Sequence, residues 1–140
     1  MMVQSKPSMA QQIGHAASAF EQKRTGHGPQ SVNVVLSEDT LVITLHGALT
    51  PAEKALAKTA EGAAQLQEFH RQLFASSADS LRLQIRQITG ADVREATAEL
   101  ETAIGGTVQV FTTGTMVQVF RLARSVPADA WSGNGSDVRS

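Results

Sequence analysis

The sequence contains no cysteine, and this absence excludes several kinds of site. A chain without thiols forms no disulfide bridge, supplies no thiolate nucleophile and lacks the cysteine ligands of the usual structural zinc sites. A reducing compartment is compatible with this composition. We therefore expect a cytoplasmic protein.

Aromatic residues and excess positive charge are also scarce. The 140 residues include five Phe, one Trp and no Tyr, and the formal net charge is -1. Binding of nucleic acid usually needs a positive field, and single strands also need aromatic rings among the basic residues. We therefore expect no nucleic-acid partner, although a local basic patch remains an alternative.

The chain has no long apolar run. Its apolar stretches are only a few residues long, far below the roughly 20 residues that cross a bilayer. The opening residues 1–7 are polar and lack the apolar middle of a signal peptide. We expect no direct membrane insertion.

The length favours one domain with frayed ends. We expect a flexible N-terminus over residues 1–7, a single domain over 8–125 and a disordered tail over 126–140. The tail is rich in Ala, Asp, Ser, Gly and Asn. Its Trp131 could dock on the domain or on a partner.

The first quarter of the chain predicts a helix, a connector and a β-hairpin. Ser8 can cap a helix that ends at Gly26, after which Gly26–Pro29 forms an irregular connector. Apolar residues then alternate over 32–36 and 41–45, on either side of a polar turn. Leu41, Ile43 and Leu45 would share the covered face of the sheet.

A capping box marks the start of the next helix. Thr50 is the expected N-cap, Pro51 occupies the first helical position, and Glu53 can reach back to the Thr50 N–H. The pattern predicts a long helix that is broken near Gly62 and ends at Thr89-Gly90. Its apolar stripe consists of Leu66, Phe69, Leu73, Leu81, Ile85 and Ile88.

The C-terminal part predicts three strands. One covers about residues 92–102, and the repeated Val-Gln-Val-Phe segments at 108–111 and 117–120 give two more. The row Glu95, Glu99, Glu101 needs either a cross-strand arginine such as Arg121 or a cation or partner. We expect an α+β fold, in which a hairpin and a C-terminal meander form an antiparallel sheet of about five strands. The N-terminal helix and the broken central helix would pack on one face.

The order of these motifs resembles the MpsC-like domain family over about residues 10–123. The shared elements are Gly26, Gly28, Pro29, the hairpin, Leu49-Thr50-Pro51-Ala52-Glu53-Lys54, Arg71, Thr89, Gly90 and Val119-Phe120-Arg121-Leu122. That family is associated with a sodium-translocating, membrane-potential-generating system. The resemblance implies a domain with no catalytic residue to carry over, working beside a separate integral membrane component of cation or inorganic-carbon transport.

Five residues form the candidate functional surface: His27, Gly28, Arg71, Arg82 and Arg86. His27 stands in a glycine connector and can titrate near neutral pH, whereas a solvated loop histidine is the alternative. Arg82 and Arg86 are one helical turn apart and could grip a phosphate or an acidic partner, or simply form a solvated face. The connector glycines follow a helix and precede a strand, which is the wrong order for a phosphate cradle.

These observations favour a non-enzymatic accessory or regulatory domain that binds another protein. A homodimer is plausible through the second strand face and the apolar helix edges. Two alternatives stay open: a small-ligand or enzymatic domain with a pocket near residues 26–29, and a nucleic-acid-binding domain that uses Arg82 and Arg86. We expect no cofactor and no metal, because the four histidines are scattered singly.

Overall fold

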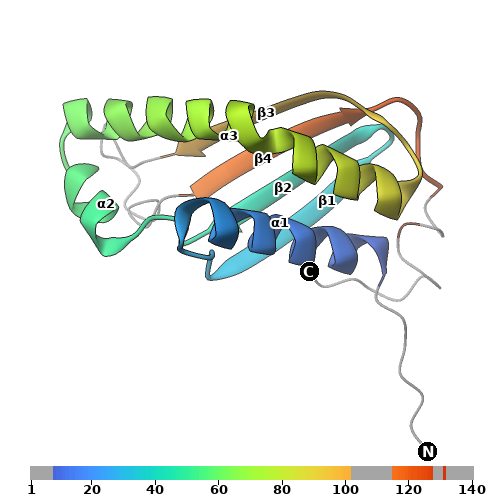
Figure 1. The fold of residues 1–140 in the computed structure, drawn as a ribbon, viewed down its shortest axis with the longest axis horizontal. Helices are drawn as coiled ribbons and strands as arrows, with labels where there is room; N and C mark the ends of the chain where they lie inside the picture. Colours follow the sequence, from blue (N-terminus) through green and yellow to red (C-terminus); the bar gives the residue numbers. More distant parts are fainter. Residues whose placement is uncertain (1–7, 102–114, 128–130, 132–140) are drawn as a thin grey trace, which may run out of the picture.

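A computed structural model describes residues 8–101, 115–127 and 131. The elements are α1 (Met9–Thr25), β1 (Ser31–Ser37), β2 (Thr40–His46), α2 (Pro51–Leu56), α3 (Ala60–Thr89), β3 (Val93–Glu101) and β4 (Thr115–Leu122). The strands form an antiparallel sheet in the order β1-β2-β4-β3, and α1 and α3 cover one face of it (Figure 1).

The α+β class and the antiparallel sheet are confirmed. The described residues supply four strands rather than about five, because the expected strand at 108–111 lies outside them. The expected N-terminal segment 1–7 and most of the tail also lie outside the described residues. Within the tail, Val126 is buried and Trp131 packs against the core.

Helix ends follow the capping residues in the sequence. The Thr50 side chain accepts a hydrogen bond from the Glu53 N–H, and the Glu53 carboxylate accepts one from the Thr50 N–H. Gly26 and Gly90 end α1 and α3 in the left-handed conformation, with φ of 80° and 79°. The predicted caps are therefore confirmed.

The break in the central helix is confirmed, but it lies just before Gly62 rather than at it. Residues 57–59 separate α2 from α3, and Thr59 caps α3 by accepting a hydrogen bond from the Gly62 N–H. A Cβ on Gly62 would lie 2.0 Å from the Leu56 carbonyl oxygen. Glycine therefore permits the close approach of the two helices at this joint.

The core lies between the two helices and the inner face of the sheet. Leu41, Ile43 and Leu45 are fully buried while Val42 and its outward neighbours are partly exposed, as the alternation predicts. Among the described residues, no helix combines the length and the apolar character needed to cross a membrane.

The predicted stripe of α3 is right at most positions and wrong at one large residue. Phe69 is 52% exposed, and the neighbouring His70 is buried in its place. The buried positions 66, 70, 74, 78, 81 and 85 follow each other at spacings of four and three. Phe69 lies off this line, so its ring points away from the core.

Candidate functional site

The connector between α1 and β1 is held by the chain's own groups. His27 Nε2 lies 3.3 Å from the Gly47 carbonyl oxygen, and the His27 N–H donates to Thr25 Oγ1 at 3.1 Å. A Cβ on Gly28 would meet Gln22 Oε1 at 2.8 Å. These contacts account for His27 and Gly28 as parts of a packed connector.

Glu21 and Arg24 form a buried ion pair at the end of α1, which the sequence pattern did not predict. Arg24 donates to the Glu21 carboxylate, and the exposed fractions of the two side chains are 4% and 0%. The Arg24 guanidinium lies 5.0 Å from the centre of the Phe20 ring and 3.8 Å from Met116 Sδ. The available signal was the position of Glu21, four residues after Ala17 on the buried stripe of α1.

His70 is a second buried polar residue that the sequence pattern missed. Its Nε2 lies 3.0 Å from Glu53 Oε2, so α3 holds the carboxylate whose other oxygen caps α2. Partial burial alone raises the pKa of Glu53. The hydrogen bond from the Thr50 N–H and the contact with His70 outweigh that effect and lower the pKa below its ordinary value.

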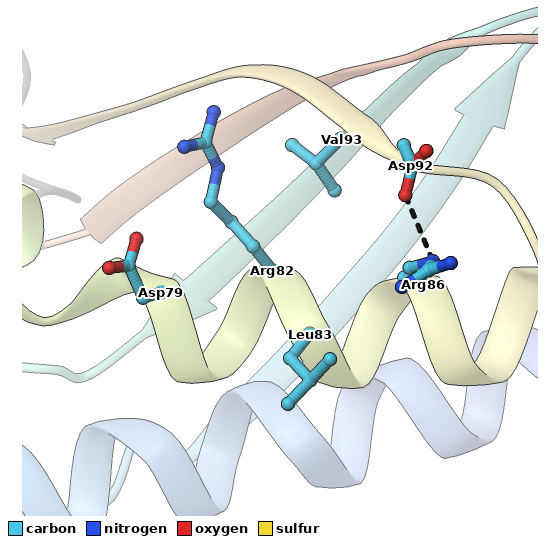
Figure 2. Close-up of a pocket in the computed structure, with 6 residues that line it drawn as sticks. All are labelled: Asp79, Arg82, Leu83, Arg86, Asp92 and Val93. Carbon is cyan, nitrogen blue, oxygen red and sulfur yellow. Dashed lines mark ion pairs between the residues drawn. The ribbon is translucent and has the colours of Figure 1, made fainter.

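Arg82 and Arg86 border one open hollow between α3 and the start of β3 (Figure 2). Its volume is about 300 Å³, and its lining is Asp79, Arg82, Leu83, Arg86, Asp92 and Val93. The structure thus brings together two of the five predicted surface residues.

The remaining predicted surface residues lie elsewhere. Arg71 is exposed on α3 about three turns before Arg82. His27 and Gly28 belong to the connector at the opposite end of the sheet (Figure 1). The five residues therefore do not form one site.

The lining of the hollow contains two arginines and two aspartates, and the two arginines make different contacts. Arg86 Nε lies 2.9 Å from Asp92 Oδ1, an ion pair in which both side chains are mostly exposed (Figure 2). Arg82 makes a long hydrogen bond of 3.4 Å to the Arg94 carbonyl oxygen. Its buried Nε has no hydrogen-bond partner in the part of the chain that the structure describes.

Apolar surface lies beside these charges. Leu83 is 52% exposed, although it is a large aliphatic residue on a folded helix, and Val93 is partly exposed. The hollow therefore offers an apolar contact together with guanidinium donors. That combination suits a protein segment that carries an apolar side chain next to a hydrogen-bond acceptor.

The described residues contain no group of three or more His, Asp or Glu side chains placed to hold a metal ion. Gly26, Pro29, Thr50, Pro51, Thr89 and Gly90 lie at helix ends or in the connector. They position the framework and do not line the hollow.

Comparison with known proteins gives the family. A family model described as "Na+-translocating membrane potential-generating system (MpsC)" matches residues 5–115. The chain is 30% identical over 110 residues to "Uncharacterized protein YbcI" of Bacillus subtilis (strain 168), and the alignment covers 79% of this chain and 89% of the relative. No solved structure matches the chain. Because the family model spans most of the sequence, as the motif order predicts, the chain belongs to the MpsC family.

Proposed function

We propose that this chain is a non-enzymatic, cytoplasmic accessory domain that binds an integral component of a membrane cation-transport system. The family description supports the kind of system. The observation that carries the proposal is the open hollow beside Leu83, where apolar surface and two arginines lie together. The partner would insert one apolar side chain beside Leu83 and Val93.

Leu83 supplies the apolar contact. Burying a leucine side chain removes apolar surface from water and is worth about 1.5–3 kcal/mol. Leu83 is half exposed, so a partner that covers it gains part of this free energy. Leu83 would therefore be an energetic centre of the interface.

The two arginines would orient the bound partner. The Arg86–Asp92 pair is mostly exposed, and exposed pairs contribute little, so a partner carboxylate can exchange with Asp92 at small cost. Arg82 has a buried Nε donor without a partner among the described residues. That atom has almost no surface to offer a partner, so a partner's acceptor would meet the Nη2 group of Arg82, whose hydrogen bond to the Arg94 carbonyl oxygen is long at 3.4 Å. We expect the binding segment to carry an acidic residue near its apolar anchor.

The test compares Leu83→Asp with a matched control on the same helix. Phe69 is as exposed as Leu83, at 52%, but does not line the hollow. Each variant is used to capture proteins from cross-linked native membranes, and the captured proteins are quantified by mass spectrometry. The wild type and Phe69→Asp should retain an integral cation-transport subunit that Leu83→Asp loses.

Two results would contradict this proposal. Capture of no integral transport subunit by the wild type is one of them. Equal capture by Leu83→Asp is the other, because it would place the interface elsewhere.

Binding of a small anion at the same hollow is a second candidate function. The two arginines in its lining, Arg82 and Arg86, favour it. A ligand at 100 times its Kd should raise the free energy of unfolding by about 2.7 kcal/mol, which a thermal-shift screen of phosphates and carboxylates detects. A screen in which no anion shifts the melting temperature rejects this candidate and leaves protein binding in place.

A further inference from the structure

The face of the sheet opposite the helices carries an apolar row. Val35 pairs with Val42, Val42 with Val119, and Val119 with Thr97, so these four β-branched residues cross all four described strands at one level. Neither α1 nor α3 covers this face (Figure 1). An antiparallel sheet usually presents polar side chains to water on such a face, whereas three of the four residues at this level are valines.

The exposure of the row points to an interface. Val35 is 57% exposed on the edge strand β1, and Val42 and Val119 are partly exposed in the middle of the sheet. The next level along the strands is polar and consists of Ser37, Thr40, Arg121 and Glu95. The face therefore has an apolar centre with charges at one side of it, as protein interfaces often do.

We propose that this face packs against the same face of a second copy of the chain. The dimer would have a twofold axis parallel to the strands, running between the two sheets at the boundary of β2 and β4. This inference is independent of the proposed function, because the hollow lies outside the apolar face and remains open on both copies.

The strand order makes the face complementary to itself. Such an axis keeps the level along the strands but places β2 of one copy over β4 of the other, and β1 over β3. Val42 then lies over Val119 of the second copy, and Val35 over Thr97. Two sheets stacked about 10 Å apart with nearly aligned strands are a common packing.

The Arg121 and Asp39 side chains agree with the same axis. Arg121 would lie over Thr40 of the second copy, beside the adjoining Asp39, whereas a like charge never lies over itself. Within one chain Arg121 and Asp39 are already 3.6 Å apart at the edge of this face, and both side chains are partly exposed. Each arginine can therefore reach the aspartate of the other copy.

The area predicts a weak dimer. Four strands about 4.8 Å apart and roughly seven residues long give a footprint near 450 Å² per copy, so the dimer would bury on the order of 1,000 Å² in total. That is the lower limit for a specific interface. We expect a dimer that dissociates on dilution.

Charge reversal tests the proposed contact between copies. Arg121→Asp puts two acidic side chains at the contact, and Asp39→Arg puts two basic ones there, so each variant alone should be monomeric by analytical ultracentrifugation. An equimolar mixture should restore dimers, because the new carboxylate at position 121 of one variant then faces the new guanidinium at position 39 of the other. The contacts within each chain stay repulsive in the mixture, so restored dimers report only on contacts between copies.

Two further variants keep the test independent of folding. Val42→Lys should weaken dimerisation at least tenfold, while Phe69→Lys on the helical layer should leave it unchanged, with circular dichroism confirming that both are folded. A wild type that is monomeric at all concentrations up to the millimolar range would overturn the proposal. So would a mixture of the two charge variants that stays monomeric, or a Val42→Lys variant that dimerises like the wild type.

Discussion

The two carboxylate oxygens of Glu53 contact groups of two different helices. Oε1 accepts the Thr50 N–H at 2.9 Å and closes the cap of α2, while Oε2 meets His70 of α3 at 3.0 Å. Helix α2 has six residues and none of them is buried. The Glu53 side chain therefore ties a short exposed helix to a buried residue of α3.

The Glu53→Gln variant should lose less stability than the wild type when the pH is lowered. The pKa of Glu53 is lowered in the folded chain. The ionised carboxylate therefore stabilises the fold at pH values above 4.5, the ordinary pKa of this group. That contribution is lost as the pH falls through the lowered value. Glutamine keeps a hydrogen-bond acceptor but has no titrating group. Urea unfolding at about pH 5.5 and about pH 3 should show a smaller loss for Glu53→Gln than for the wild type. Equal losses would contradict this role.

Replacing Glu21 alone should be costly. Glu21→Leu leaves the buried Arg24 guanidinium without its carboxylate, and removing one partner of a buried pair costs about 3–5 kcal/mol. Glu21→Leu combined with Arg24→Met removes both charges and should recover most of this loss. Urea unfolding measures all three free energies. A double variant no more stable than the single one would show that the pair does not act as a unit.

Some of these residues were predictable from the sequence and others were not. Thr50 and Glu53 are three residues apart, so their capping box is a local pattern. The partner of His70 is 17 residues away and depends on how α2 folds back on α3. Glu21 and Arg24 are local in sequence, but their burial depends on segments far away in the chain, and Met116 of β4 is one residue that Arg24 contacts.

Among the helices, alanine substitutions at two glycines should change the stability of the fold in opposite directions. Gly62→Ala places a Cβ 2.0 Å from the Leu56 carbonyl oxygen, whereas Gly14→Ala places one 3.6 Å from Val34 Cγ2, an ordinary contact. We expect Gly62→Ala to destabilise the fold by about 1–3 kcal/mol. Gly14→Ala should stabilise it by up to about 1 kcal/mol, because alanine favours the helix. Thermal unfolding compares them, and a stabilising Gly62→Ala would refute the close approach of α2 and α3.

The hairpin, the helix stops and the strand near residues 92–102 were predictable, because alternation and glycine are local signals. The insertion of β4 between β2 and β3 was not. Pairing between residues 40–46 and 115–121 joins segments far apart in the chain. The hollow was not predictable either, because it depends on how the chain folds back after α3. Arg82 and Arg86 lie on α3, while Asp92 and Val93 lie in the segment that follows it.

In the whole molecule, we propose different binding roles for two surfaces. The hollow lies between α3 and the start of β3, and the apolar row lies on the face of the sheet that the two helices leave uncovered. A dimer through the sheet would present two hollows to the outside. Two linked sites raise the apparent affinity for a partner that has two copies of the binding segment.

Site-specific photocrosslinking in living cells tests directly whether the hollow binds a membrane transport subunit. A photoreactive amino acid replaces Leu83 in one strain and Phe69 in another, because the two positions are equally exposed on α3. We expect a crosslink from position 83 to an integral subunit of a cation-transport system, and no such product from position 69. No crosslink to such a subunit from position 83, or one of equal yield from position 69, would contradict the proposed docking site.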